Sequence, residues 1–559
     1  MNNKKNIILE EYENEFSYKK SKTNLDIQFN RIAFIFFVFL MISVIYSIQL
    51  LHLGSLKAED SKKFLTVNKN HRADILDRNG NYLVKTVKSI DIGINPIEVI
   101  DKKKLLINLQ LIFPNKNYAE VIKKLEKNKF FYFEKKISSE NYEKIMLLGD
   151  KSIKSEEKLT RIYPQKNLFS HIIGQIDDEN KGISGLEKSF NEKLKQTSEP
   201  LKLTVDTDIQ FLIREELVKF QSIFRSKGST AILMNVNNGE IISMVSYPDF
   251  DLNKREKIVD LNFINRATKG VYELGSVFKT FTVAAGLEEG LINTDTEFLN
   301  LEKRLQCGKS SISEYDNKIP SDLTVEQILI RSGNIGSVRI GQKLEIIKLK
   351  AFLEKIGILS KINFDIEEVG EPIPFKWGKC KLATVSFGHG ITTTPLQLAK
   401  AYAIISNGGF AVEPSLIKNE LKNYQKKKRI IKAGISEKIN PILRKIVTTK
   451  EGTAGFVNIE GYEVGGKTGT AEKSIAGGYT RKAKVNTFAG IFPTSNPKYV
   501  LIVLLDEPKT SSDYVYEYKN KKGSYKGTPF NTAGWTSVEV AGKIIEKIGP
   551  ILATKHMEN

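Results

Sequence analysis

The sequence predicts a membrane-anchored α+β protein whose C-terminal part is an antiparallel sheet packed by helices. Three observations support this: a long apolar run near the N-terminus, and two hairpin signals far apart in the chain with helical patterns between them. The 559 residues are too many for one ordinary domain. The expected segments are a cytoplasmic tail at 1–30, a transmembrane signal anchor at 31–52, a pedestal domain at 57–200 and a larger domain at 201–553.

The apolar run at residues 32–51 reads IAFIFFVFLMISVIYSIQLL and holds no charge. At about 1.5 Å per residue, a helix of this length crosses a hydrocarbon core of about 30 Å. Lysines and Arg31 precede the run and favour a cytoplasmic N-terminus, and LGSLKAED after it offers no good cleavage site. We expect an uncleaved single-pass anchor; a buried core helix is the alternative.

Composition narrows the classes of partner. Lys and Arg number 85 against 65 Asp and Glu, which gives a net charge of +20. The lysines are spread rather than clustered, so we favour a lysine-biased composition over nucleic-acid binding.

Cys307 and Cys380 lack metal or redox spacing, and they could form one disulfide or stay unpaired. Residues 57–200 contain no catalytic cluster, which is typical of a pedestal or spacer.

The larger domain is predicted from strand and turn signals. Two β-rich runs flank Asn237-Asn238-Gly239, a strong hairpin signal, and two more flank the TSNP turn near the C-terminus. Helical patterns lie between the hairpins, and one more nearly ends the chain. Hairpins at both ends indicate one antiparallel sheet with helices on its faces. Residues 507–530 are expected to form a long polar, tyrosine-rich loop, a candidate lid or recognition segment.

A serine and a lysine three positions apart stand in YELGSVFKTF, at Ser276 and Lys279. This S-x-x-K pattern is weak alone, because the chain contains it five times, starting at Ser17, Ser155, Ser276, Ser415 and Ser495. The third copy differs because Gly275 permits a tight turn and an apolar helix is expected to open at Ser276. Positions i and i+3 share a helix face, so Lys279 could reach the Ser276 hydroxyl. The ordinary alternative is a capping serine and a solvated lysine.

Two further motifs follow in order. Ser332-Gly333-Asn334 ends a helical pattern, and Lys467-Thr468-Gly469-Thr470 lies in a predicted strand. S-x-N alone is poor evidence, since Ser139-Glu140-Asn141 also matches it, whereas K-T-G occurs once. The ordered set of three is the strongest functional signal in the chain.

This ordered set resembles the class B penicillin-binding proteins, the membrane-anchored peptidoglycan D,D-transpeptidases. The resemblance extends to RADILDRNG in the pedestal and to SYPDFDLN and ATVSFGHGITTTPLQLAKAYA in the larger domain. It implies the penicillin-recognising serine transpeptidase fold, with about five antiparallel strands between helical layers. It also implies an enzyme in the bacterial inner membrane with its catalytic domain in the periplasm, no cofactor and no metal. Ala73 and Leu274 depart from the usual family residues without touching the chemistry.

The resemblance also implies partners and a process. The substrates are lipid-linked peptidoglycan stem peptides, and β-lactams are the expected inhibitors. A SEDS-type glycosyltransferase and other division-complex proteins are the expected protein partners. The motif contexts are more similar to the division-specific branch, so septal wall synthesis is the predicted role. The alternatives are an elongation-specific transpeptidase, a β-lactam-hydrolysing or penicillin-sensing relative, and an idle wall-synthesis scaffold.

Roles follow from the family and from side-chain chemistry. Ser276 is the expected nucleophile that carries the acyl group, and Lys279 is its base once burial and a second cation at Lys467 remove its proton. Ser332 is expected to relay a proton, and Asn334 to hold Lys279 and a substrate carbonyl. The residues expected to bind the terminal carboxylate and backbone of the donor peptide are Lys467, Thr468, Gly469 and Thr470. Because Gly469 lacks a side chain, the peptide is expected to lie along this strand as an added edge. His389 is a weaker candidate base; a position in the cleft wall is the favoured interpretation.

Overall fold

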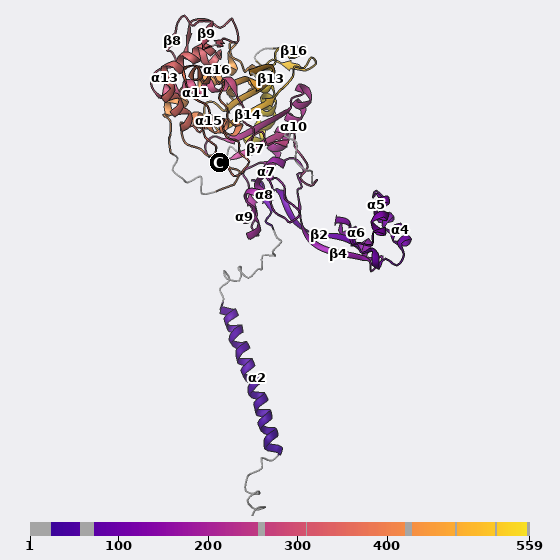
Figure 1. Ribbon diagram of the computed structural model, residues 1–559. Helices are drawn as coiled ribbons and strands as arrows, with labels where there is room; N and C mark the ends of the chain where they lie inside the picture. Colours follow the sequence, from indigo (N-terminus) through magenta and orange to yellow (C-terminus); the bar gives the residue numbers. More distant parts are fainter. Residues whose placement is uncertain are drawn as a thin grey trace, which may run out of the picture. The chain divides into compact units, whose positions relative to one another are not determined.

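The computed structural model describes residues 24–55, 72–254, 263–308, 310–419, 428–475, 478–519 and 522–555. The chain divides into two compact units, residues 1–69 and residues 70–559 (Figure 1). Most of the expected tail at 1–30, including the first S-x-x-K copy at Ser17, lies outside the described residues.

The first unit contains one long helix, α2 (Asn24–Ser55). Its segment Arg31–Leu51 is 21 residues long and apolar enough to cross a membrane. Large apolar side chains along this segment are exposed, Phe34 and Phe36 among them. A core helix of a soluble protein would bury such side chains, so the helix fits a single-pass membrane anchor.

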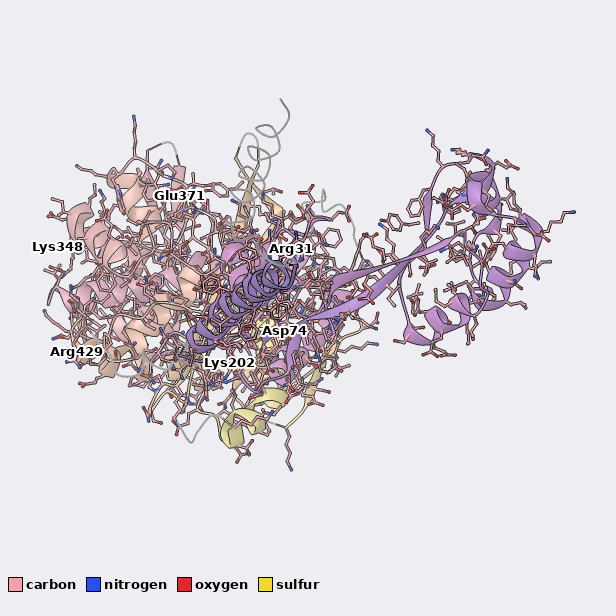
Figure 2. The ribbon with its side chains drawn as sticks, turned by 90° about the horizontal axis from the view of Figure 1, so that it is seen from below. Arg31, Asp74, Lys202, Lys348, Glu371 and Arg429 are labelled. Atoms are coloured by element: carbon pink, nitrogen blue, oxygen red, sulfur yellow. A yellow bond between two sulfur atoms is a disulfide. The ribbon has the colours of Figure 1, made fainter. Side chains whose placement is uncertain are left out.

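The second unit begins with a mixed sheet and a small lobe. The strands of the sheet are β1 (Ile75–Leu76), β2 (Tyr82–Ile94), β3 (Phe131–Ile137), β4 (Ile153–Ile162) and β5 (Leu201–Lys202), in the order β3-β2-β1-β5 with β4 also on β2. Asp74 and Lys202, labelled in Figure 2, mark where β1 and β5 run in parallel.

The lobe lies at the far end of β2 and β4 (Figures 1 and 2). Its helices are η1 (Pro96–Glu98), α4 (Lys102–Ile112), α5 (Tyr118–Glu126) and α6 (Ser139–Met146). The three α-helices begin at capping side chains, Asp101, Asn117 and Ser138, each of which accepts a backbone N–H of the first turn. Leu105 and Val121 belong to a small core that is separate from the main core of the unit.

Short helices then lead back to the sheet: α7 (Ser170–Ile173), α8 (Gly185–Ser189) and α9 (Asn191–Gln196). Here three buried charged side chains meet. Arg72 and Arg161 both bind the carboxylate of Glu187, the second with an Nη2–Oε1 distance of 2.8 Å. Arg161 also donates to the backbone oxygens of Arg72 and Ala73, so the cluster joins the start of β1 to β4 and α8.

The larger sheet has five antiparallel strands, as the hairpin signals and the resemblance predicted. The strands are β6 (Gly228–Asn235), β7 (Ile241–Tyr247), β12 (Gly465–Ile475), β13 (Gly478–Phe492) and β14 (Tyr499–Asp506), in the order β12-β13-β14-β6-β7. The β6–β7 turn contains Gly239 at φ +78°, a conformation that favours glycine. The strand that carries the K-T-G motif, β12, lies at the edge of the sheet.

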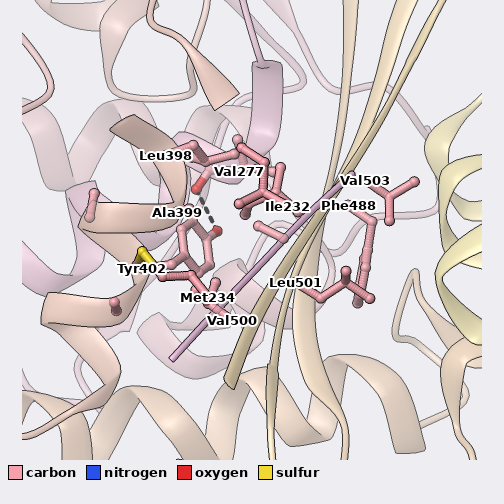
Figure 3. Close-up of a cluster of buried hydrophobic side chains, with 14 of the residues drawn as sticks. Ile232, Met234, Val277, Leu398, Ala399, Tyr402, Phe488, Val500, Leu501 and Val503 are labelled. Atoms are coloured by element: carbon pink, nitrogen blue, oxygen red, sulfur yellow. Dashed lines mark hydrogen bonds between the residues drawn. The ribbon is translucent and has the colours of Figure 1, made fainter. Parts of the chain in front are cut away.

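Helices cover both faces of this sheet. α10 (Thr207–Phe224) and α17 (Ser537–Lys555) pack on one face, and α15 (Pro395–Ser406) packs on the other. Figure 3 shows Ile232, Met234 and Val500 facing Tyr402 of α15, with Phe488 and Leu501 on the opposite side of the sheet. The Tyr402 hydroxyl donates to the Val277 carbonyl at 2.9 Å, which ties α15 to the segment that carries Ser276.

The remaining elements complete the unit. They are η3 (Gly275–Phe278), α11 (Lys279–Glu288), β8 (Glu297–Phe298), β9 (Arg304–Cys307), β10 (Ser310–Ser313), β11 (Leu323–Thr324), α12 (Val325–Ile330), α13 (Asn334–Lys355), α14 (Lys379–Val385), α16 (Ala433–Thr448), η5 (Gly455–Val457) and η6 (Ala533–Trp535). Among them, η3, α16 and η6 contact the edge strand. The expected loop at 507–530 is not unstructured, because it carries a short hairpin, β15 (Val515–Glu517) with β16 (Ser524–Lys526). The Tyr516 side chain anchors this hairpin in the core beside Phe456 and Trp535.

Candidate active site

The segment that carries Ser276 is a tight turn pressed against the edge strand. The expected α-helix does not open at Ser276: residues Gly275–Phe278 form a 3₁₀ turn, and the α-helix starts at Lys279. Gly275 has φ +62°, and a Cβ there would lie 2.7 Å from the Thr470 carbonyl oxygen. A Cβ at Gly469 would lie 2.1 Å from the Leu274 carbonyl oxygen. Both glycines are therefore needed for the turn to approach β12.

This contact corrects the reason expected for Gly469. The missing side chain was predicted to make room for substrate, whereas its space is filled by the backbone of the Ser276 turn. The Ser276 side chain is half-buried. Within the ranges that the structure describes, its hydroxyl makes no hydrogen bond, so the expected direct contact with Lys279 is not formed.

Lys279 is fully buried and reaches the second motif instead. Its Nζ donates to Asn334 Oδ1 at 2.7 Å, to Ser332 Oγ at 3.2 Å and to the Ser332 carbonyl. Ser332 lies between α12 and α13 with φ +58°, in the left-handed region that a serine seldom adopts. This strained turn aims its carbonyl and hydroxyl at the same ammonium group.

Lys467 approaches Ser332 from the edge strand. It is also fully buried, and its Nζ donates to Ser332 Oγ at 2.8 Å and to the Thr468 carbonyl at 3.2 Å. The Ser332 hydroxyl therefore joins the two lysines. One lysine from each outer motif and the serine of the middle motif form a continuous hydrogen-bonded path.

Burial dominates the electrostatics of this pair. Removal from water lowers the pKa of Lys279 to about 7, while the nearby Glu314 acts in the opposite direction. Burial lowers the pKa of Lys467 well below its usual value, and the Lys279 charge lowers it further. Repulsion between two lysines is mutual, so the expectation that a protonated Lys467 helps to deprotonate Lys279 stays a prediction, and Glu314 is a second charge that acts on Lys279 and favours its protonated form.

Asn334 is held on both sides of its amide. Its Oδ1 accepts from Lys279, and its Nδ2 donates to the Ser313 carbonyl at 2.8 Å. Its backbone N–H donates to Glu314 Oε2 at 2.7 Å, and Ile335 N–H donates to Glu314 Oε1 at 2.8 Å. Glu314 was missed by the sequence reasoning, and no local motif marks it.

The hydroxyls of the third motif lie on the other face of the edge strand. Thr468 Oγ1 is 2.7 Å from Thr453 Oγ1, and Thr470 Oγ1 accepts the Ala533 backbone N–H at 2.9 Å. Lys467 and these hydroxyls are predicted to form one carboxylate site; in the structure Lys467 Nζ donates to Ser332 Oγ while the hydroxyls lie on the opposite face, so the shared site stays a prediction. A peptide lying along the open edge of β12 could meet both faces.

One other candidate residue, His389, lies in a loop beside the turn. The loop of His389 packs on it, since a Cβ at Gly388 would lie 1.9 Å from the Gly275 carbonyl oxygen. The His389 ring is tilted against Tyr479, and its Nδ1 lies 3.6 Å from Glu273 Oε2. Within the described ranges, no hydrogen bond joins this ring to Lys279 or Lys467. Cys307 and Cys380 form a disulfide that joins β9 to α14. Among the described residues, no cluster of three or more His, Cys, Asp or Glu side chains could hold a metal.

Comparison with protein families gives two matches in tandem. Residues 68–220 match the penicillin-binding protein dimerisation domain. Residues 229–528 match the penicillin-binding protein transpeptidase domain, and this range contains all three motifs.

Individual relatives match over most of the chain. The probable peptidoglycan D,D-transpeptidase FtsI of Caulobacter vibrioides is 30% identical over 497 residues, which are 87% of this chain and 82% of the relative. The peptidoglycan D,D-transpeptidase FtsI of Buchnera aphidicola is 28% identical and covers 86% of this chain and 90% of its own. Among solved structures, penicillin-binding protein 3 of Mycobacterium tuberculosis, complexed with aztreonam, has the same fold with a TM-score of 0.64. It is 20% identical and covers 87% of this chain and 96% of its own.

Proposed function

The chain belongs to the class B penicillin-binding proteins, which are peptidoglycan D,D-transpeptidases, and on this premise we propose that Ser276 forms the acyl-enzyme that cross-links stem peptides during septal wall synthesis. The observation that carries the proposal is the Lys279–Ser332–Lys467 path beside the Ser276 turn. A serine hydroxyl needs a base, and a fully buried lysine with a lowered pKa can be one.

The proposed first step is attack of Ser276 Oγ on the carbonyl carbon of the penultimate D-alanine. Neutral Lys279 takes the hydroxyl proton, and the backbone N–H groups of Ser276 and Thr470 stabilise the oxyanion, each worth about 3 kcal/mol. The C–N bond to the terminal D-alanine then breaks. Its amine receives a proton through Ser332, which both lysines can supply.

The second step repeats this chemistry in reverse. The acceptor amine of another stem attacks the acyl carbon, gives its proton to the same path, and displaces Ser276 Oγ. The product is a new peptide cross-link, and the free serine is restored. The path contains two lysines that can hold the proton. This suits a reaction in which the group that acts as a base in the first half acts as an acid in the second.

The cellular setting is proposed from the relatives' names and from the anchor. Two relatives share the name FtsI, which supports a septal role over elongation or an idle scaffold. We place α2 as the membrane span and the catalytic unit in the periplasm, with a pedestal at 57–200 and a transpeptidase domain at 201–553. A SEDS-type glycosyltransferase and other division proteins are the proposed partners, and no nucleic acid is involved.

The test is acylation of the detergent-solubilised full chain by a labelled penicillin. The label is expected on the peptide that contains Ser276 and is expected to vanish in Ser276→Ala. Ser155→Ala is the matched control, because it belongs to an S-x-x-K copy whose lysine, Lys158, is only half-buried and is paired with Glu156. A label retained in Ser276→Ala would overturn the assignment, and a fluorescent fusion that fails to gather at division sites would overturn the septal role.

A further inference from the structure

Helix α13, which carries Asn334, begins without a cap of its own. The residue before it is Gly333, which has no side chain to accept the backbone N–H groups of the first turn. The carboxylate of Glu314, just after β10, fills this place and accepts from Asn334 N and Ile335 N at 2.7 and 2.8 Å. A negative charge at a helix N-terminus is stabilised by the helix dipole.

The same carboxylate is linked to the catalytic lysine by hydrogen bonds through a single residue, Asn334. The backbone N–H of Asn334 donates to Glu314, and its side-chain oxygen accepts from Lys279. Its side-chain nitrogen donates to the carbonyl of Ser313, the residue before Glu314. A displacement of Glu314 would therefore move the oxygen that holds Lys279. Glu314 is half-buried, so its charge is only partly screened by water.

The hairpin that presents Glu314 is fastened at its other end. Strands β9 and β10 pair from Ser313–Arg304 to Ser310–Cys307, and Cys307 is bonded to Cys380 at the start of α14. Residues after α14 pack on the Ser276 turn at Gly388. Glu314 is thus mounted on a segment that is covalently joined to the neighbourhood of the nucleophile.

We infer that Glu314 is a positioning residue of the transpeptidase. Its carboxylate holds the first turn of α13, and with it Asn334, against Lys279. The same carboxylate supplies a negative charge that favours the protonated form of Lys279. The inference rests on the proposed function, in which neutral Lys279 is the base. Two charged groups act on this lysine from different elements, Lys467 from β12 and Glu314 from the end of β10. Removing the Glu314 charge makes protonated Lys279 less stable, so its pKa falls.

The experiment measures the rate of acylation by a labelled penicillin against pH, with the full chain in detergent. In Glu314→Gln the part of the rate–pH curve that rises with pH should move to lower pH by about one unit, because Lys279 has lost a neighbouring negative charge. The plateau of the curve should fall about tenfold, because the amide caps the helix less well. Glu314→Asp keeps the charge, so the rising part of its curve should stay at the wild-type pH while its plateau falls. Glu302→Gln, which removes an exposed carboxylate bonded to Arg339, is the control and should change neither.

The outcomes separate the two proposals. Wild-type protein without a label at Ser276 would overturn the proposed function. Labelled wild type with a Glu314→Gln profile that superimposes on it would overturn the inference alone. Melting curves show whether each variant is folded. If Glu314→Gln is unfolded, Glu314→Asp tests the inference instead. A rate–pH curve of Glu314→Asp with an unchanged plateau, or with its rising part displaced along the pH axis, contradicts the role given to the carboxylate.

Discussion

Two clusters of buried basic side chains in this protein differ in their partners: one is paired with a carboxylate and the other is not. In the pedestal, Arg72 and Arg161 share the carboxylate of Glu187. In the transpeptidase site, Lys279 and Lys467 share only the neutral hydroxyl of Ser332, and the carboxylate whose charge acts on Lys279, Glu314, is bound to the backbone of α13. Burial of a charge is costly in both places.

The difference teaches what makes a buried cation reactive. An arginine cannot lose its proton in a protein, so the pedestal needs a counter-ion and obtains one. A lysine can lose its proton, so the active site can leave its cations without a paired carboxylate and obtain a base. The first cluster stabilises the fold, and the second supplies chemistry. The predictions below test this division, from the largest expected effect to the smallest.

The largest effect is expected from Lys279→Arg, which gives the active site the residue type of the pedestal. The guanidinium keeps its proton at any workable pH and cannot act as a base. We expect acylation by a labelled penicillin to fall about a thousandfold or more. Lys473→Arg, at an ion-paired position of β12, should leave the rate unchanged. A rate within about threefold of wild type in Lys279→Arg would show that this lysine is not the base.

The second prediction removes the counter-ion of the pedestal. Glu187→Gln leaves Arg72 and Arg161 buried with uncompensated charge, and breaking a buried ion pair in this way costs about 3–5 kcal/mol of the free energy of unfolding. Denaturant unfolding measures the loss, with the exposed Glu192→Gln as the control. Acylation of the folded variant should stay near wild type. A loss of stability no larger than that of the control would mean that the pedestal cluster is not the structural counterpart proposed here.

The sequence predicted those parts of the molecule that have a local pattern. The hairpins around Gly239 and TSNP, the apolar anchor and the five-stranded sheet follow from periodicity, turn residues and family resemblance. The three motifs were found in the same way, because each is a short run. Their meeting point at Ser332 follows from the fold that the resemblance implied.

The parts that could not be predicted depend on contacts between distant segments. Glu314 is one glutamate among many in the sequence, and only the fold brings it to the first turn of α13. Gly469 was recognised, but the neighbour that requires it, the Leu274 carbonyl, lies far back in the chain. The Lys279 side chain was expected on Ser276 from helix geometry, whereas tertiary hydrogen bonds hold it on Asn334.

The third prediction concerns the pH dependence of acylation. The Lys279 pKa of about 7 means that the neutral base is scarce in acid and abundant in alkali. The rate should fall about tenfold per unit below pH 7 and level off above it. Single-turnover acylation between about pH 5 and 9 measures this limb. A flat profile would remove the contrast with the pedestal, since both clusters would then keep a fixed charge.

The smallest expected effect concerns recognition of the donor carboxylate, and it follows from the same contrast. If burial removes most of the positive charge from Lys467, that lysine is a weak partner for a substrate carboxylate, and hydroxyl donors must contribute. Thr470 Oγ1 accepts the Ala533 N–H, so its own proton is available to donate. A hydrogen bond to a charged group is worth about 1.5–3 kcal/mol, or about tenfold or more in rate.

We therefore expect Thr470→Val to lose about tenfold of the preference for a peptide ester with a free terminal carboxylate over its amide. The preference is the ratio of the two acylation rates, so a general loss of activity cancels from it. Thr487→Val is the matched control. This threonine faces Gly469 in the register of β13, it is buried, and in the part of the chain that the structure describes its hydroxyl has no partner. An unchanged ratio in Thr470→Val, together with a reduced ratio in Lys467→Ala, would show that Lys467 binds the carboxylate as a cation, and the contrast between the two clusters would not hold.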